Sequence, residues 1–209
     1  MDEKGQELVE KSAEIYKKFG IKSVTMDDLA RHLGVSKKTL YKYFKDKNDI
    51  VTRSIANKME AEACSVNKVC EFASNAIDEL MGITQNVIEN LNKIHPSVFY
   101  DLEKYYPEAF EKIEEHKKGF IYNCVLGNLE RGKKEGLYRS DLNSEIIAKL
   151  YVLRVTDILN PYNFDENKFT PMDIYMEAFR YHIRGIASEK GIEYQEKLIQ
   201  LNQENEKNT

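Results

Sequence analysis

The sequence predicts an all-α protein, and three observations support this prediction. Only 4 prolines and 10 glycines occur in 209 residues, too few for the closely spaced turns of a β sandwich or barrel. Apolar side chains recur at helical spacing over long stretches. Residues that start and stop helices stand at the ends of these stretches. The hydrophobic fraction of 42% is enough for a packed core, so a disordered chain is excluded.

The N-terminal part of the chain predicts short helices over residues 4–19, 26–33 and 37–43, then one that begins at 46 and extends into the sixties. Thr25 and Asp28 have the spacing of a capping box before the second of these helices. Gly34 ends that helix, and Ser36 is suited to cap the next one.

Longer helices are predicted over residues 68–92, 107–135, 143–159 and 171–187. Gly132 and Gly136 indicate a break after the second of them. Thr170 and Asp173 flank a proline, which is a strong signal for the start of the last helix. The polar segment 202–209 is expected to fray.

Two helices of about eight residues joined by a short turn have the dimensions of a helix-turn-helix. The second helix presents cations and hydroxyls at Lys37, Lys38, Thr39, Tyr41, Lys42 and Tyr43. No acidic residue occurs from 29 to 45, which suits a helix in a DNA major groove. Lys47 stands in a first helical turn, where the helix dipole disfavours a cation, so it indicates an external anion such as phosphate. The alternatives are tyrosines that pack, lysines that are merely solvated, and a module that binds only protein.

Residues 8–50 resemble the tetracycline-repressor (TetR) family of bacterial transcriptional regulators, most specifically in the run Val35-Ser36-x-x-Thr39-Leu40-Tyr41-x-Tyr43-Phe44-x-x-Lys47. The resemblance implies a DNA-binding domain over residues 1–50, with a connecting helix to about 65. It also implies a helical effector-binding and dimerisation domain over residues 66–209. By position it implies phosphate contacts from Thr25, Tyr41, Tyr43 and Lys47, and base or backbone contacts from Ser36, Lys37, Lys38 and Thr39. Lys38 departs from the small residue common in the family, so base preference does not carry over.

The apolar character of segments 143–159 and 171–187 exceeds a single stripe, which predicts burial on two sides. Pairing with a second copy would bury the additional face in a four-helix bundle. The expected dimer contacts are Leu150, Leu153, Ile174, Phe179 and Ile183. The alternative is that this face is covered within one chain.

Aromatic residues are concentrated in the middle of the chain, which is typical of an apolar pocket with hydroxyl groups. The expected ligand-binding residues are Phe99, Tyr105, Phe120, Tyr122, Cys124 and Tyr151. The alternative is that these aromatic residues form an ordinary core.

The expected function is a repressor that binds a palindromic operator in double-stranded DNA as a homodimer. A small apolar or amphipathic effector is expected to release it, without a cofactor. The alternative is a helical small-molecule or lipid-binding protein that lacks operator-specific DNA binding. No residue three before a histidine is a glutamate, and no phosphate-binding glycine motif or serine nucleophile motif occurs, so the protein is not expected to be an enzyme.

Three cysteines without a C-x-x-C spacing argue against a disulfide framework or a zinc site, and no apolar run is long enough to span a membrane. A cytoplasmic location is expected. The formal charge of −4 does not exclude DNA, because the charge is unevenly distributed. Residues 1–60 carry +3 and residues 61–209 carry −7, while 31–58 alone carry +6. Salt screens the acidic part over about 8 Å, so the basic end can meet DNA.

Overall fold

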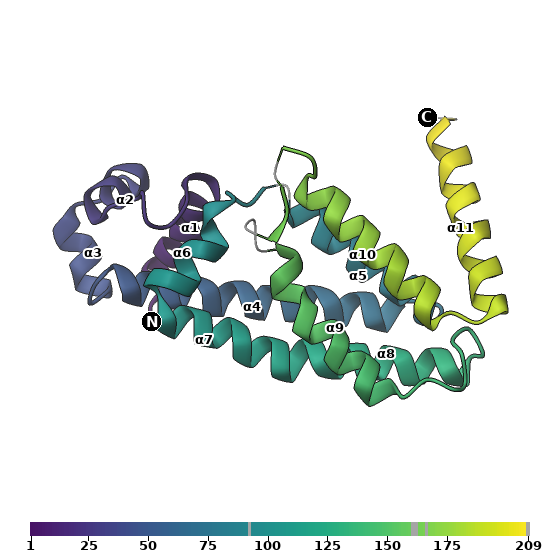
Figure 1. Cartoon of the computed structure of the whole chain (residues 1–209). Coiled ribbons are helices and arrows are strands. Elements are labelled where there is room, and N and C mark those ends of the chain that lie inside the picture. Colours follow the sequence, from purple (N-terminus) through teal and green to yellow (C-terminus); the bar gives the residue numbers. More distant parts are fainter. Residues whose placement is uncertain (92, 160–162, 166, 208–209) are drawn as a thin grey trace.

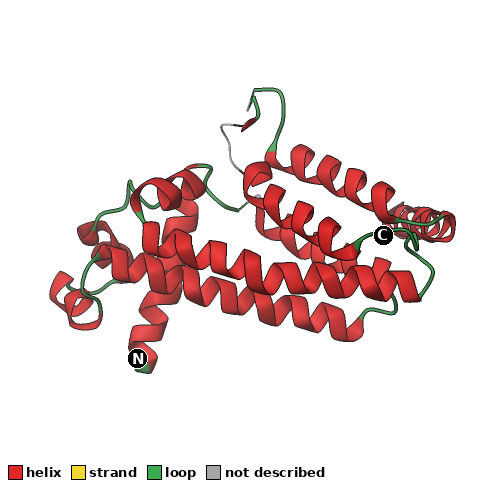
Figure 2. Ribbon diagram, turned by 60° about the horizontal axis from the view of Figure 1, so that its bottom comes forward, coloured by secondary structure: helices red, strands yellow, loops and turns green. Residues whose placement is uncertain are grey.

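The computed structural model describes residues 1–91, 93–159, 163–165 and 167–207. Its helices are α1 (Glu3–Phe19), α2 (Met26–Leu33), α3 (Lys37–Tyr43), α4 (Lys47–Phe72), α5 (Ala76–Leu91), α6 (Ser97–Tyr105), α7 (Pro107–His116), α8 (Tyr122–Lys134), α9 (Ser144–Leu159), α10 (Pro171–Ile186) and α11 (Glu189–Lys207), with a π-helical turn η1 (Lys117–Ile121) before α8. Within the described residues, the only β pairing is one isolated bridge between Tyr138 and Ala187. The predicted all-α class is confirmed (Figures 1 and 2).

Helix α4 runs along much of the molecule, and α1, α5 and α7 pack against it. Figure 1 shows α2 and α3 at one end of the molecule and α11 at the other. Helix α9 packs on α8, and α10 packs on α5 and α9. The helix-turn-helix therefore occupies one end, and the helices of the larger domain extend away from it.

The local signals that start and stop helices act as the sequence predicts. The Thr25 hydroxyl accepts from the backbone N–H of Asp28 (3.2 Å), and the Asp28 carboxylate accepts from the N–H of Thr25 (3.0 Å). The same reciprocal pair forms between Thr170 and Asp173 at the start of α10. Gly34 has a φ of 66°, a left-handed conformation that favours glycine and lets the chain turn between α2 and α3.

The predicted helix over 68–92 is wrong in its boundaries. Helix α4 extends to Phe72, and α5 begins at Ala76 after a short turn. The Asn75 side-chain carbonyl accepts from the backbone N–H of Asp78 (3.1 Å), which satisfies a donor that the new helix would otherwise leave free. An asparagine cap therefore divides what periodicity alone suggests is continuous.

The structure also contains helices that the pattern did not predict. Helix α6 follows directly on Pro96, and α11 follows Ser188. The Ser188 hydroxyl accepts from the backbone N–H of Gly191 (3.1 Å), so it caps the start of α11. The segment 202–209 was expected to fray, but the helix continues to Lys207.

Gly132 lies inside α8 and does not mark a break there. A Cβ atom at this position would lie 2.1 Å from a ring carbon of Tyr138. That ring is 2% exposed, and its hydroxyl donates to the backbone oxygen of Ala76 (3.1 Å) and the side-chain oxygen of Asn128 (2.9 Å). Because the backbone of Gly132 is helical, its conformation would allow other residues. The close approach of the Tyr138 ring is what requires a glycine here.

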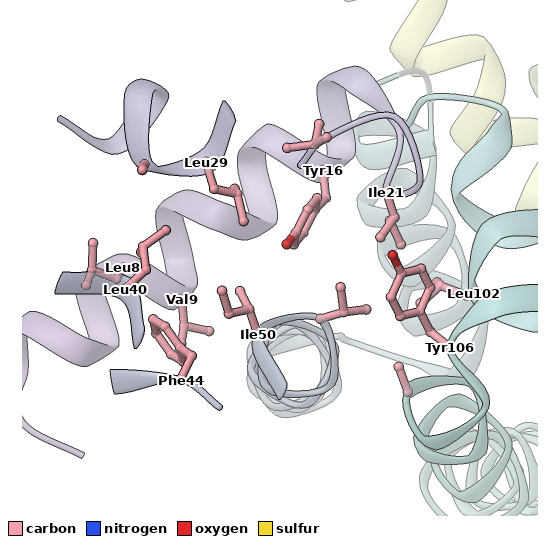
Figure 3. Packing of buried hydrophobic residues seen from close by; sticks show 14 of the residues in the cluster. Leu8, Val9, Tyr16, Ile21, Leu29, Leu40, Phe44, Ile50, Leu102 and Tyr106 are labelled. Atoms are coloured by element: carbon pink, nitrogen blue, oxygen red, sulfur yellow. The ribbon is translucent and has the colours of Figure 1, made fainter. Parts of the chain in front are cut away.

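The molecule has two hydrophobic cores. The first core consists of Leu8, Val9, Tyr16, Ile21, Val24, Leu29, Ala30, Leu40, Phe44, Ile50, Val51, Leu102, Tyr106, Ala109 and Ile113. The second core consists of Ala76, Ile77, Leu80, Leu129, Leu137, Tyr138, Leu142, Ala148, Ile183, Ile186 and Ala187. Figure 3 shows Leu102 and Tyr106 facing the residues of α1 to α4. The first core therefore joins the helix-turn-helix to α6 and α7.

Candidate nucleic-acid interface

Helix α3 is fixed by its cap and by the core beneath it. The Ser36 side chain accepts from the backbone N–H of Thr39 (3.0 Å), and the two hydroxyl oxygens lie 2.8 Å apart in a second hydrogen bond. Leu40 and Phe44 are buried beside Leu29 (Figure 3). Because these inward residues hold α3 in one orientation, its remaining residues face outward as a set.

Most of the predicted DNA contacts lie on the surface. The exposed residues are Thr25, Ser36, Lys37, Lys38, Tyr41 and Lys42, and the half-buried ones are Thr39, Tyr43 and Lys47. Tyr41 is 50% exposed, so it does not serve to fill the core. Tyr43 packs against the first core and therefore has a structural role as well.

The lysines of α3 differ in their electrostatic partners. Lys37 Nζ donates to the carboxylate of Asp27 (3.0 Å), and this hydrogen bond raises the pKa of the lysine. Lys42 Nζ lies 5.3 Å from the ring centre of Tyr43. Within the described part of the chain, neither Lys38 nor Lys42 forms an ion pair. Their positive charge is therefore available to an external anion.

Lys47 lies at the first position of α4, and its side chain points inward. Its Nζ donates to the backbone oxygens of Ile21 (2.6 Å) and Lys22 (3.4 Å). Burial lowers the pKa of Lys47. The cation thus holds the turn that precedes α2. A phosphate contact from Lys47 stays a prediction, and it would require the side chain to share its donors or to turn outward.

Asp101 of α6 holds the same turn from the other side, and no sequence pattern predicts this role. Its carboxylate accepts from the backbone N–H groups of Ile21 (3.0 Å) and Lys22 (2.8 Å). The side chain is 4% exposed, so these hydrogen bonds form away from water. The turn between α1 and α2 is therefore bound to both α4 and α6, which links the helix-turn-helix to the larger domain.

The predicted ligand residues do not all lie together. Tyr105 lies apart at the surface: it is 37% exposed, and its hydroxyl accepts a hydrogen bond from Lys22 Nζ (2.8 Å). The expectation that it lines an interior pocket is therefore wrong, since it contacts the turn before α2. The others are half-buried: Phe99, Phe120, Tyr122, Cys124 and Tyr151. Phe120 stacks on His116 with ring centres 5.0 Å apart, and Tyr122 packs against the second core.

A polar group lies where α9 and α10 meet. The rings of Tyr151 and His182 are tilted against each other with centres 4.9 Å apart. Burial, followed by the nearby charge of Arg154, lowers the pKa of His182 to about 4, so the imidazole is neutral at pH 7. The Tyr175 hydroxyl lies near those of Tyr151 and of Thr84 on α5, and burial raises the pKa of both tyrosines. Of the predicted ligand residues, Tyr151 is the one that belongs to this group.

The predicted dimer contacts fall into two sets. Leu150 and Leu153 are 55% and 68% exposed, and Ile146 on the same side of α9 is 55% exposed. This leaves an apolar stripe on α9 without cover in one chain. Ile183 is only 1% exposed and belongs to the second core, so it is not available to a partner. Ile174 is half-buried, as is Phe179, which packs against the second core.

Neither a metal centre nor a membrane span is found among the described residues. No group of three or more His, Cys, Asp or Glu side chains is arranged to hold a metal ion there. No helix in that part combines the length and apolar character needed to cross a bilayer.

Residues 8–53 match the family described as bacterial regulatory proteins, tetR family. Over 50 residues the chain is 44% identical to an HTH-type transcriptional regulator of Mycobacterium tuberculosis, which covers 24% of this chain and 21% of that protein. The chain therefore spans about a fifth of that relative, and the likeness is confined to the helix-turn-helix region.

Solved structures match over most of the chain. The reduced form of E. coli NemR has a TM-score of 0.73 at 11% identity and covers 90% of this chain and 98% of that one. The transcriptional regulator FadR from Bacillus subtilis, in complex with stearoyl-CoA, has a TM-score of 0.63 at 19% identity and covers 87% and 98%. The matched family and the FadR structure are described as transcriptional regulators. The helix-turn-helix region is therefore similar in sequence to the TetR family, and the whole chain shares its fold with the solved structures that it matches.

Proposed function

We propose that this protein is a DNA-binding transcriptional repressor. The observation that carries this proposal is the outward face of α3, which presents Lys38, Tyr41 and Lys42 on a helix that its cap and the first core hold in place. The acid-free stretch of residues 29–45 gives that face a single sign of charge. Such a helix can enter a major groove, with base edges and phosphates as its targets.

The proposed DNA target is a palindrome, because the protein is proposed to act as a homodimer. The exposed stripe of Ile146, Leu150 and Leu153 supports this, since burial against the same stripe of a second copy would remove apolar surface from water. In such a dimer, two copies of α3 would read half-sites about 34 Å or somewhat more apart.

An apolar or amphipathic effector is proposed to release the protein from DNA. It would bind among α5, α8, α9 and α10 and alter how α6 holds the turn at Ile21 and Lys22. The B. subtilis FadR structure supports this proposal in kind, because stearoyl-CoA is an amphipathic molecule. A coupling of about 1–3 kcal/mol is typical of such systems.

The test of DNA binding compares Lys38→Ala with Lys47→Ala. Lys47→Ala is expected to weaken binding to specific and random DNA alike and to flatten the salt dependence by about one unit. Lys38→Ala is expected to change sequence preference instead. Fluorescence anisotropy over a salt series, on a fragment from the promoter region of its own gene and on a scrambled duplex, measures both.

Lys134→Ala is the control, because Lys134 is exposed at the far end of α8. It should bind both duplexes as the unaltered protein does. Because Lys47 also holds a turn, a melting curve of each variant separates lost folding from lost contact. Equal effects of the two substitutions on both duplexes would contradict the proposed roles. Ligand binding without any DNA binding would favour a carrier protein instead.

The test of dimerisation is Leu153→Glu. A charge placed in the apolar stripe of α9 is expected to convert the dimer to a monomer, because the interface would bury an unpaired carboxylate. Sedimentation equilibrium measures the mass, and operator affinity should fall with it. Phe72→Glu is the control, since Phe72 is 79% exposed but lies on α4 and not on α9. A dimer that tolerates Leu153→Glu would place the interface elsewhere.

A further inference from the structure

Arg154 of α9 is a cation held against the interior of the larger domain. The centre of its guanidinium lies 5.4 Å from the ring centre of Tyr151, one helical turn earlier on the same helix. Its charge also reaches His182 of α10, whose pKa it helps to lower. The side chain is half-buried. Arg154 therefore lies between the exposed apolar stripe of α9 and the side of α9 that contacts α10.

In the described part of the chain, no carboxylate pairs with this charge. Among the described residues, no hydrogen bond or ion pair within 4.0 Å joins Arg154 to a carboxylate or a carbonyl. Burial raises the pKa of Tyr151 and Tyr175, and the charge of Glu62 on α4 adds a small contribution in the same direction. Glu62 itself forms no ion pair with Arg154 within that distance. A guanidinium that is partly removed from water with an aromatic ring beside it but no carboxylate costs free energy, so its presence calls for a reason.

Hydroxyl groups are arranged beside the guanidinium. Tyr175 of α10 lies near Tyr151 of α9 and Thr84 of α5, since these side chains influence its pKa or have theirs influenced by it. Thr84 itself donates to the backbone oxygen of Leu80 (2.8 Å). The hydroxyls of Tyr151 and Tyr175 can turn their protons toward an added acceptor, since a phenol both donates and accepts.

Apolar side chains next to this group keep part of their surface accessible. On α5, α8, α9 and α10 several apolar residues outside the second core, or at its edge, are half-buried and not buried. Examples are Met81, Val87, Val125, Val155, Ile158 and Ile174. An apolar body lying here would cover the remaining apolar surface and would place a polar head within reach of Arg154.

We infer that the effector is an anionic amphipathic molecule whose negatively charged group binds Arg154 and the hydroxyls of Tyr151 and Tyr175. The regulatory role of this ligand rests on the proposed function, whereas its binding to the site does not depend on DNA binding. A charged hydrogen bond from arginine to a carboxylate, sulfonate or phosphate is stronger than a neutral one. The ligand would supply the counter-ion that the described residues do not.

Two fluorescent probes with the same aromatic skeleton test the inference. 8-Anilinonaphthalene-1-sulfonate carries one negative charge, and N-phenyl-1-naphthylamine is neutral. The unaltered protein is expected to bind the anionic probe more tightly, and decanoate should displace it while decan-1-ol displaces it less. Arg154→Met is expected to weaken binding of the anionic probe about tenfold or more and to change binding of the neutral probe less than about twofold.

Arg180→Met is the matched control, because Arg180 is exposed on α10 and already paired with Glu177 (3.1 Å). It should leave both probes unaffected. A melting curve gives a second readout. If Arg154 is retained for a ligand, Arg154→Met should raise the Tm of the ligand-free protein by about 2 °C, because an uncompensated charge is removed.

Equal loss of both probes in Arg154→Met, or failure of the unaltered protein to bind either probe, would overturn the inference. A lower Tm for Arg154→Met would assign the side chain a structural role and would also overturn it. Failure of the proposed function would look different: the anionic probe would bind as expected, while the ligand-free protein would bind no DNA.

Discussion

Gly132→Ala is expected to lower the free energy of unfolding by about 3 kcal/mol, at the upper end of what overpacking in a core costs. The added Cβ would lie 2.1 to 2.6 Å from three ring carbons of Tyr138. The ring cannot simply rotate away, because its hydroxyl is bonded to Ala76 and Asn128 in the second core. Either the helix or the ring must move, and both are buried. Urea denaturation measures the change.

Gly127→Ala is the control on the same helix. A Cβ at Gly127 meets no atom within 4 Å, so this substitution is expected to stabilise the protein by about 0.5 to 1 kcal/mol through helix propensity. The double variant Gly132→Ala/Tyr138→Leu should lose less stability than the sum of the two single variants, because the smaller leucine relieves the overlap with the added Cβ. If Gly132→Ala proved as stable as Gly127→Ala, the close packing of Tyr138 would be refuted.

Asp101→Ala is expected to destabilise the protein by about 3 kcal/mol, because it leaves the backbone N–H groups of Ile21 and Lys22 without their acceptor in a buried site. The effect should extend to DNA affinity, since the freed turn leads directly into α2. Thermal unfolding measures the first effect and operator titration the second.

Asp141→Ala is the comparison for Asp101→Ala, because the Asp141 side chain is 75% exposed and only 3.7 Å from the exposed Arg139. A surface pair of this kind contributes at most about 1 kcal/mol. Asp101→Asn retains one acceptor oxygen and should fall between the two. Should Asp101→Ala and Asp141→Ala cost the same, the turn would not depend on α6 for its conformation.

The predictions that held depend on neighbouring residues. The capping box of Thr25 and Asp28 and the turn at Gly34 are decided within a few residues, so spacing alone locates them. The starts of α5 and α11 depend on similar local signals, the side chains of Asn75 and Ser188. Periodicity favoured longer helices, and a polar cap overrides periodicity.

The parts that the sequence could not reveal depend on distant residues. Asp101 contacts a turn 80 residues earlier, and no pattern around it distinguishes a buried acceptor from an exposed acid. Tyr105 was grouped with interior aromatics because of its composition and spacing, yet it lies at the surface beside Lys22. Lys47 matches a phosphate-binding position, whereas its bonds to backbone oxygens became visible only in three dimensions.

The first core is shared between the helix-turn-helix and helices α6 and α7. This limits how segments of this protein can be exchanged with those of similar proteins. Leu102, Tyr106 and Ala109 fill space beneath the helix-turn-helix, although they lie far beyond it in the sequence. A helix-turn-helix fragment that ends at residue 50 would therefore lack part of its own hydrophobic core. A helix-turn-helix that is exchanged between proteins must therefore include the surface of α6 and α7 against which it packs. Under the proposed function, new combinations of operator and effector must therefore preserve that fit, and specificity can change only on the surfaces that point away from it.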